Sequence, residues 1–357
     1  MVKGLIITTL ILVVFGLVML SSAGIIDSQK KFGDSYYYPK HQLFYSIIPG
    51  LILMFFLSKT RYKIWKKLSF LILFGALILT GLVFLPGYGF GLKGATRWIN
   101  ISGFVFQPSE TLKLALIIYL AAWFSGRRER VKNWFFGGAP FFVILGVTGA
   151  MLALQPDIGT LIVVTIIALG LYFVAGVEFK KFVSLILVLL VILSVLIWIE
   201  PYRFERVKTF LNPSEDTRGS SYQINQALIS IGSGGIFGVG YGKSTQKFGF
   251  LPEVVGDSIF AVIAEELGYV GSVFTISLFV ILSFILLRIA KNADDKFGMM
   301  LVTGINIWIC AQAFVNIAAI SGLAPLTGIP LPFISYGGTA MIALLAGLGI
   351  VLNVAKS

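Results

Sequence analysis

The chain has 357 residues, of which 57% are hydrophobic and only 12% are charged, and its mean hydropathy is +0.93. Because soluble proteins carry roughly 25% charged residues, this composition excludes a soluble enzyme and a disordered regulator. The single cysteine, Cys310, excludes an intrachain disulfide and a cluster of cysteine ligands. The single histidine, His41, excludes a zinc site of several histidines and disfavours a histidine-centred catalytic triad.

Apolar stretches predict an all-α polytopic membrane protein with ten transmembrane helices in one membrane domain, 1–357. A spanning helix needs about 20 largely apolar residues. The first stretch is too long for a cleaved signal peptide and lacks a small-residue cleavage pattern. The fifth and sixth are separated because Pro156 breaks a run that is too long for one span. The predicted spans are 4–25, 42–58, 68–86, 109–125, 139–154, 158–176, 182–199, 258–288, 298–320 and 337–354.

Lys and Arg residues divide unevenly between the two sets of connections. The set that includes both termini carries 16 of the 28 basic residues, and the short connections on the other side carry five. The positive-inside rule therefore places both termini in the cytoplasm. The inner set also carries four acidic residues, which leaves +12, the net charge of the whole chain. The basicity thus reflects orientation against an anionic leaflet, and no nucleic-acid partner is expected.

Two external segments are unusual, 87–108 and 200–257. A long segment of this kind is usually functional. Within the second, 222–231 predicts a short amphipathic helix. Eight glycines follow between positions 232 and 256, a density that favours tight turns and close backbone approach. A nucleotide-binding loop is disfavoured because no strand precedes these glycines and they face outside.

Ionisable residues inside the predicted spans are functional candidates, because charge is expensive in a bilayer. Glu110 and Lys113 lie three residues apart, so they can pair on one helix face, either to allow insertion or to serve a substrate. Asp157 can cap the helix that begins after it. No basic residue in their own span compensates Glu265 and Glu266, so at least one should face a polar cavity or a partner elsewhere in the bundle.

Two further features concern the interior and the outer boundary. Trp308, Gln312 and Asn316 recur every four residues, which predicts a stripe that lines the bundle interior and makes core hydrogen bonds. Asp257 ends the glycine-rich segment and directly precedes an apolar run. A carboxylate there tends to have a raised pKa and suits a general base. An ordinary N-cap of the following helix is an equally good interpretation.

Five ordered stretches extend along nearly the whole chain. They are GATRWINISGFVFQPSETLKLA (94–115), LQPDIGT (154–160), FLNPSEDTRGSSYQINQALISIGSGGIFGVGYGKSTQKFGFLPE (210–253), DSIFAVIAEELG (257–268) and PLTGIPLPFISYGG (325–338). Together they resemble the SEDS family (shape, elongation, division, sporulation), whose members include FtsW and RodA. Ten spans with a long external loop between the seventh and eighth are also similar to that family. The compact GVGYGKSTQKFGFLPE and the amino-terminal GLVMLSSAG resemble the FtsW branch, which acts in division, more than the RodA branch, which acts in elongation.

The resemblance implies a peptidoglycan glycosyltransferase that polymerises lipid II, the undecaprenyl-pyrophosphate-linked disaccharide-pentapeptide. It implies work on the outer face of the bacterial cytoplasmic membrane, with a class B penicillin-binding protein transpeptidase and other divisome or elongasome proteins as partners. Asp257 falls on the catalytic aspartate of the family, and Arg97 and Lys113 fall on its external arginine and span-four lysine. The matching motifs add candidates for substrate binding: Glu110, Gln246, Glu253, Ser335 and Tyr336.

The chemistry implied at this site needs one base. Pyrophosphate leaves as a stable anion, so no second carboxylate has to protonate it, provided that positive charge stabilises it. Arg97, Lys243 and Lys247 are candidates to hold phosphate, with Mg²⁺ or Mn²⁺ as a possible cofactor. The two lysines can equally be solvated loop charges, and Lys113 would organise the cavity through its neighbour in the same span.

The immediate neighbours of Asp257 depart from the family pattern. This chain reads Val255-Gly256-Asp257-Ser258, whereas many relatives have a polar pair before the aspartate and Phe after it. Two rival functions also remain open: a transporter that moves lipid II across the bilayer, and a scaffold for the transpeptidase. Inverted internal repeats would favour transport, and no clear pair of halves is visible in the sequence.

Overall fold

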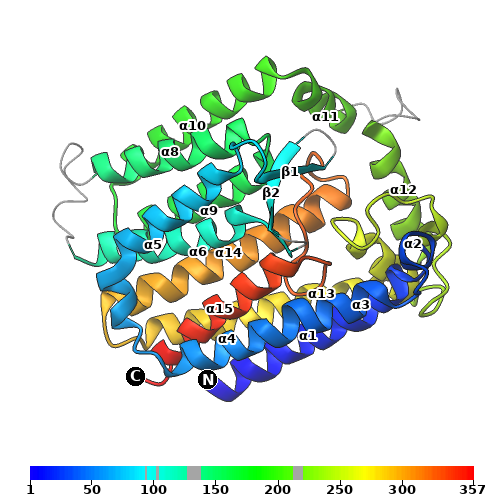
Figure 1. Cartoon of the computed structure of the whole chain (residues 1–357), viewed down its shortest axis with the longest axis horizontal. Coiled ribbons are helices and arrows are strands. Elements are labelled where there is room, and N and C mark those ends of the chain that lie inside the picture. The colour runs from blue at the N-terminus through cyan, green and yellow to red at the C-terminus, as the bar shows by residue number, and fades with distance from the viewer. Residues whose placement is uncertain (93–94, 102–103, 127–137, 212–219) are drawn as a thin grey trace.

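The computed structural model describes residues 1–357 except 93–94, 102–103, 127–137 and 212–219, and it is an elongated bundle of helices (Figure 1). Both termini lie at the same end of the bundle (Figure 1). The π-helix η1 (Leu43–Ile47) joins α3 to α4, and a 3-10 turn, η3, covers Gln246–Phe248. The α-helices are α1 (Val2–Ala23), α2 (Ile25–Phe32), α3 (Tyr37–Gln42), α4 (Ile48–Lys59), α5 (Lys63–Leu82), α6 (Pro108–Ser125), α8 (Ala139–Leu154), α9 (Ile158–Val174), α10 (Phe179–Ile199), α11 (Pro201–Leu211), α12 (Ser220–Ser233), α13 (Ile259–Lys291), α14 (Lys296–Ile320) and α15 (Gly338–Val354).

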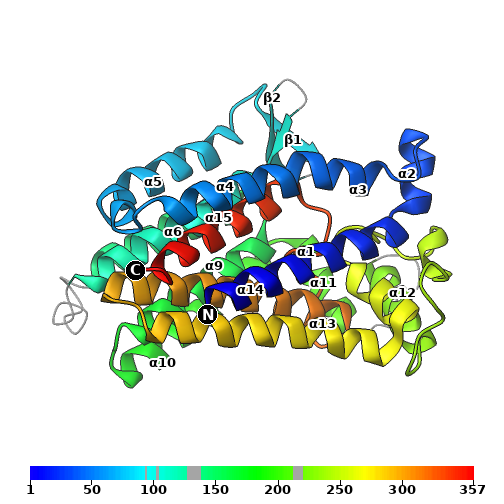
Figure 2. The same ribbon diagram turned by 90° about the horizontal axis from the view of Figure 1, so that it is seen from below.

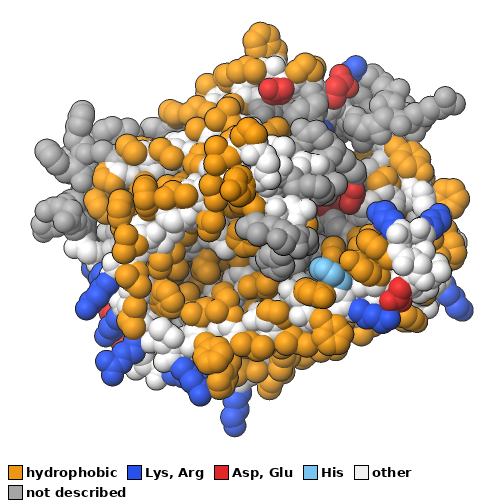
Figure 3. Space-filling view, viewed as in Figure 1, with side chains coloured by type: hydrophobic (Ala, Val, Ile, Leu, Met, Phe, Trp, Pro, Cys, Tyr) orange, Lys and Arg blue, Asp and Glu red, His pale blue; other side chains and the backbone are white. Residues whose placement is uncertain are grey.

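Helices occupy each of the ten stretches that the sequence predicts as spans. Among the described residues, six helical segments are long and apolar enough to cross a membrane, and three shorter apolar helices accompany them. Apolar side chains cover the middle of the molecule, and Lys and Arg gather towards its two ends (Figure 3). This distribution is that of a multi-pass membrane protein. The six segments are Val2–Ala23, Tyr37–Lys59, Lys63–Leu82, Phe179–Ile199, Ile259–Lys291 and Lys296–Ile320.

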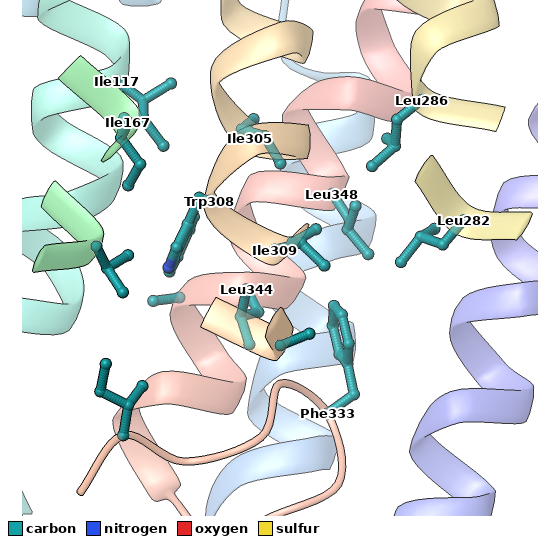
Figure 4. Packing of buried hydrophobic residues seen from close by; sticks show 14 of the residues in the cluster. Ile117, Ile167, Leu282, Leu286, Ile305, Trp308, Ile309, Phe333, Leu344 and Leu348 are labelled. Atoms are coloured by element: carbon teal, nitrogen blue, oxygen red, sulfur yellow. The ribbon is translucent and has the colours of Figure 1, made fainter. Parts of the chain in front are cut away.

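Helix α14 forms the centre of the bundle, and α10 lies at its edge. In the apolar part of α14, 72% of the residues are buried, against 6% in α10. Trp308 of α14 lies in one apolar cluster with Ile117 of α6, Ile167 of α9 and Leu344 of α15 (Figure 4). The central position of α14 explains why its polar residues must find partners inside the protein.

Close helix contacts depend on glycine. A Cβ atom on Gly304 would lie 2.6 Å from the side chain of Ile117, and one on Gly349 would lie 2.7 Å from the backbone oxygen of Met54. Without the hydrophobic effect of water, helices in a membrane associate through tight van der Waals packing, which small residues permit. These glycines therefore hold α6, α14, α15 and α4 together.

The turn between α8 and α9 agrees with the predicted break. Helix α8 ends at Leu154 and α9 begins at Ile158. Asp157 is the N-cap residue of α9, and its carboxylate accepts a hydrogen bond from the backbone N–H of Thr160 at 3.2 Å. The predicted capping role of Asp157 is therefore confirmed.

The segment 87–108 is partly a β-sheet, which the sequence analysis missed. Strands β1 (Gly89–Leu92), β2 (Ala95–Ile101) and β3 (Phe104–Phe106) form an antiparallel sheet in the order β1-β2-β3. Three short strands without a long alternating pattern give little periodic signal. The sheet connects α5 to α6 in the chain and lies to the right of both helices in Figure 1.

Helix α13 corrects the predicted span 258–288 in one respect. Its backbone breaks at Gly268, where φ is 68° and ψ is −161°. A Cβ atom on Gly268 would lie 2.3 Å from the backbone nitrogen of Gly238, so the glycine-rich segment packs directly on this break. Glu265 and Glu266 consequently lie in the short helical part before the break, next to that segment, and not in the continuous part that follows.

The end of the bundle away from both termini carries α2, α12 and the glycine-rich segment 232–257 (Figures 1 and 2). The predicted helix 222–231 is confirmed within α12. The 321–337 loop, which joins α14 to α15, lies in contact with the start of α13, because the N–H of Tyr336 donates to the carbonyl of Val255 at 2.8 Å. This meeting of α11, α12, α13 and the 321–337 loop positions the candidate site.

Candidate functional site

Asp257 lines a pocket at the start of α13. The pocket holds about 110 Å³ and lies between α11, α12, the start of α13 and the 321–337 loop. The amide of Gln223 donates to the Asp257 carboxylate at 3.2 Å and to the Ser258 hydroxyl at 3.0 Å. The pocket is half polar and half apolar, and its lining residues are Arg206, Thr209, Phe210, Gln223, Ile224, Asp257, Leu326 and Gly328.

The surroundings of Asp257 change its acidity. Burial raises the pKa of Asp257 to about 6, and the negative charge of Glu253 adds to that rise, while Arg206 and the hydrogen bond from Gln223 oppose it. A carboxyl group with a pKa near 6 is mostly ionised at neutral pH and is more basic than an ordinary aspartate. These are the properties that a general base needs.

The alternative reading of Asp257, as an ordinary helix cap, does not match the structure. The N-cap residue of α13 is Ser258, and no side chain caps that helix end. The carboxylate of Asp257 instead accepts from Gln223 on α12. Its side chain therefore belongs to the pocket.

Hydrogen bonds from two sides hold the backbone around Asp257. The amide of Asn316 on α14 donates to the carbonyl of Asp257 at 2.8 Å and to that of Ile329 at 2.7 Å. The hydroxyl of Ser335 donates to the carbonyl of Gly256 at 2.7 Å. The 321–337 loop and the segment before α13 are thus tied together through α14, and Asp257 sits at the junction.

Lys113 and Glu110 form a buried pair in the bundle and do not line the pocket. The ammonium of Lys113, whose residue is 1% exposed, donates to Glu110 at 2.9 Å and to Gln312 at 2.8 Å. Gln312 also accepts from the indole of Trp308 and donates to the carbonyl of Pro330 at 3.0 Å. The predicted interior stripe on α14 therefore connects this pair to the 321–337 loop.

Arg97 lies at the turn between α8 and α9 and is not among the residues that line the pocket. From β2, its guanidinium donates to the carbonyls of Pro156 and Gln155, the latter at 3.4 Å, and lies 3.7 Å from the carboxylate of Asp157. Its charge therefore fastens the sheet to this turn. Phosphate binding by Arg97 would have to share the guanidinium with these contacts.

Lys247 has a buried setting in the glycine-rich segment. Its ammonium donates to Glu266 at 2.9 Å, to Ser22 at 3.0 Å and to the carbonyl of Gly242 at 2.7 Å, and the residue is 4% exposed. Phosphate binding by Lys247 would require these bonds to break. Glu266 thus has the partner outside its own span that the sequence analysis expects.

The remaining candidates in the glycine-rich segment and in the part of α13 next to it have different settings. Glu265 accepts hydrogen bonds from Ser230, Ser244 and the backbone and hydroxyl of Thr245. Lys243 and Glu253 are exposed, and Gln246 is half-buried in η3. Of these, Glu253 is close enough to Asp257 to influence its pKa.

Tyr336 lies beside the pocket loop in an aromatic cluster. Its hydroxyl is 3.0 Å from Nδ1 of His41, and its ring packs edge-on against Tyr38 at 4.9 Å between centroids. Burial raises the pKa of Tyr336 to about 12, so its hydroxyl stays protonated. Tyr336 therefore connects α3 to the loop and is not one of the residues that line the pocket.

The structure brings Arg206 and Gln223 to the site, and the sequence analysis singled out neither. Gln223 lies in the helix that the sequence predicts, but its direction could not be assigned. Arg206 lies in α11, a helix inside a segment treated as a loop. The spacing of Arg206, Thr209 and Phe210 at i, i+3 and i+4 would have placed them on one helix face if that helix had been predicted.

Comparison with known proteins gives the family. The FtsW/RodA/SpoVE family model, described as "Cell cycle protein", matches residues 3–357. The chain is 40% identical to a "Probable peptidoglycan glycosyltransferase FtsW" of Geobacter sp. (strain M18), covering 96% of this chain and 94% of that protein. It is 39% identical to "Stage V sporulation protein E" of Bacillus subtilis (strain 168), covering 99% and 96%.

Solved structures agree with this result. One, from a study titled "Structural coordination of polymerization and crosslinking by a peptidoglycan synthase complex", has a TM-score of 0.84 and 27% identity, and the match covers 99% of this chain and 97% of the other. The crystal structure of the rod shape determining protein RodA of Thermus thermophilus has a TM-score of 0.73 and 28% identity, covering 99% and 96%. The chain belongs to the FtsW/RodA/SpoVE (SEDS) family, and its resemblance to the FtsW-like branch is confirmed.

Proposed function

We propose that this chain is a peptidoglycan glycosyltransferase that polymerises lipid II with Asp257 as the general base. Relatives that cover nearly the whole chain at 37–40% identity are named probable peptidoglycan glycosyltransferases FtsW. The observation that carries the assignment of the base is the setting of Asp257, a carboxylate in a pocket with a pKa raised to about 6. Several of these relatives are named FtsW, which favours a role in division over a role in elongation.

The reaction in this proposal is an inverting glycosyl transfer. Asp257 takes the proton of the 4-hydroxyl of the acceptor N-acetylglucosamine, and that oxygen attacks the anomeric carbon of the donor N-acetylmuramic acid. The bond from that carbon to the pyrophosphate oxygen breaks, and undecaprenyl pyrophosphate leaves with the electron pair. One base is enough because the leaving group is already a stable anion. Activation of a hydroxyl by a positioned base contributes roughly 10²–10⁴-fold to the rate.

The proposal includes a divalent cation that would neutralise the negative charge of the pyrophosphate. Mg²⁺ is commonly held by one or two carboxylates together with substrate phosphates. Among the described residues, no three His, Cys, Asp or Glu side chains gather as a complete metal site. Glu253, exposed beside Asp257, is the carboxylate that would share such an ion with the substrate. Chelation of divalent ions during lipid II polymerisation tests this directly.

We further propose that both termini face the cytoplasm and that the Asp257 pocket faces the outside of the bacterial cytoplasmic membrane. The termini lie at one end of the bundle, and α11 and α12, which contribute residues to the pocket, lie towards the other (Figure 1), in agreement with the side that the basic residues assign to the termini. A class B penicillin-binding protein is the proposed partner, because one similar structure comes from a complex that coordinates polymerisation with crosslinking.

Glycan synthesis by the purified protein tests the function. Asp257→Asn should fold, reach the membrane and fail to polymerise lipid II, because an amide cannot accept the proton. Asp34→Asn, which changes a partly exposed carboxylate that pairs with Lys40 and does not line the pocket, is the matched control and should stay active. Glycan made by Asp257→Asn at a near wild-type rate would overturn the catalytic assignment.

The same assay separates the rival functions. In liposomes with lipid II only in the leaflet that faces the pocket, an enzyme consumes the lipid and a transporter leaves it intact. A scaffold would tolerate substitutions around the pocket, while substitutions on the outer faces of the helices would impair binding of the transpeptidase.

A further inference from the structure

The pocket of Asp257 contains a positive charge that was not a candidate from the sequence. Of the cations proposed to hold phosphate, Arg97 contacts the turn between α8 and α9, and Lys247 is buried against Glu266. Lys243 is exposed and is not among the residues that line the pocket. Arg206 does line the pocket, and it is an exposed residue that a bound substrate could reach.

Helix α11 presents Arg206 to the pocket in a defined way. Arg206, Thr209 and Phe210 occupy one face of the helix, so an arginine, a hydroxyl and an aromatic ring point to the same space. Nη1 of Arg206 donates to the carbonyl of Leu326 at 2.9 Å, which fixes the guanidinium against the 321–337 loop. Leu326 and Gly328 of that loop also line the pocket. The guanidinium therefore has a position set by the fold.

Gly328 of the 321–337 loop leaves room beside the carboxylate of Asp257. Gly328 has a φ of 72°, and a Cβ atom built on it would lie 3.9 Å from an oxygen of Asp257. A side chain at position 328 would be strained and would fill the space next to that oxygen. The glycine keeps open space for a substrate group next to Asp257, in the pocket that Arg206 also lines.

We propose that Arg206 binds the pyrophosphate of a polyprenyl-linked sugar in the Asp257 pocket and is the cation that stabilises the leaving group. This inference rests on the proposed function and deepens it. As the acceptor oxygen bonds to the anomeric carbon and its proton passes to Asp257, the electron pair of the broken bond stays on the pyrophosphate oxygen. A planar guanidinium matches phosphate with two parallel hydrogen bonds, which an ammonium cannot do.

The charges around Asp257 give this proposal a second readout. Arg206 from α11 and Glu253 act on the carboxylate with opposite sign, while the facing side chain of Gln223 from α12 and the backbone contact of Asn316 from α14 are neutral. Loss of the guanidinium should raise the pKa of Asp257. The acid limb of the rate profile should therefore move to higher pH in Arg206→Gln.

Binding of undecaprenyl pyrophosphate to the purified full-length protein tests the proposal. Arg206→Gln should weaken the affinity by about tenfold or more, as expected for the loss of a charged hydrogen-bonding partner. Arg206→Lys should weaken it less. Lys208→Gln removes the same charge from the same helix at an exposed position outside the pocket, and it should leave the affinity unchanged. Wild-type affinity in Arg206→Gln would overturn the proposal.

A purely structural role for Arg206, as a link to Leu326, gives a different pattern. It predicts a lower melting temperature with unchanged affinity for undecaprenyl pyrophosphate and an unmoved pH profile, and that pattern would also overturn the proposal. If Arg206→Gln does not fold, Arg206→Lys decides, because unchanged affinity there contradicts two-point binding. Failure of the proposed function looks different: wild-type protein would bind the lipid and make no glycan, or Asp257→Asn would remain active.

Discussion

Two groups of carboxylates at the head of α13 have opposite settings. Glu266 is fully buried and accepts hydrogen bonds from Ser22, from the backbone of Ser244 and from the ammonium of Lys247. Glu265, next to it, accepts four hydrogen bonds from the glycine-rich segment and α12. Asp257, at the end of the glycine-rich segment, lines a pocket and accepts from the amide of Gln223.

The difference shows how burial can serve structure or reactivity. Donors that surround a carboxylate stabilise its charge, and a buried ion pair that loses one member leaves an uncompensated charge in the protein. The glutamates therefore anchor the glycine-rich segment to α13. Burial of Asp257 without a full set of donors raises its pKa to about 6 and makes it a stronger base. The glutamates drew attention in the sequence as ionisable residues in a span, yet the reactive setting belongs to Asp257.

The largest expected effect is on stability and concerns Glu266→Ala. It leaves Lys247 buried without its carboxylate, which should cost about 3–5 kcal/mol of unfolding free energy. Asp257→Asn should show the opposite sign or no change. The folded pKa of Asp257 lies above its ordinary value, so stability is lost as the pH rises through about 6, and a neutral amide avoids that loss. Unfolding in detergent at pH 7.5 compares them, and equal destabilisation would contradict the distinction.

Gly268→Ala tests whether the break in α13 positions the glutamates. The added Cβ would approach the backbone of Gly238 too closely, and φ at this position is 68°. We expect a loss of about 2–3 kcal/mol from strain and displacement of the glycine-rich segment. Gly75→Ala, where nothing lies within 4 Å of the new atom, is the control. Wild-type stability in Gly268→Ala would show that the segment does not depend on this contact.

Much of the fold is predictable because long apolar runs carry a strong signal. Helices lie at all ten predicted stretches, and the break at Pro156 and the cap at Asp157 follow from local chemistry. The partner of Glu266 could be expected but not named, because Lys247 approaches it through the tertiary fold. The strands around residues 89–106 were missed, since short strands have little periodicity.

The site was only partly predictable for a related reason. Asp257 stood out by its place between a glycine-rich segment and an apolar run. The direction in which Lys247 and Arg97 point could not be read from their positions, and both contact other parts of the protein. Arg206 and Gln223 reach the pocket from two helices that pack together only in the folded chain. The tertiary fold decides which side chains are buried and where they point, so the residues around a position in the sequence carry no signal for either.

Asn316→Ala tests whether the backbone ties around Asp257 serve catalysis. Loss of the two hydrogen bonds to the carbonyls of Asp257 and Ile329 should lower kcat by about thirtyfold, because each bond contributes about 1 kcal/mol to the positioned state. Asn353→Ala is the matched control, since this asparagine bonds to Ser58 and Tyr62 near the termini. It should lower stability without lowering kcat per folded molecule. An equal loss of kcat in both would assign Asn316 to general stability.

The smallest effect sharpens the contrast between the reactive and the structural carboxylates. The ionised form of Asp257 is the base, so kcat/KM should fall as the pH drops through about 6 in the wild type. Glu253 raises the pKa of Asp257 by its negative charge, so Glu253→Gln should move this limb to lower pH. Asp34→Asn, at a partly exposed carboxylate that is not among the groups acting on Asp257, should leave the limb in place. A shift of the limb to higher pH in Glu253→Gln would mean that a group other than Asp257 controls the rate.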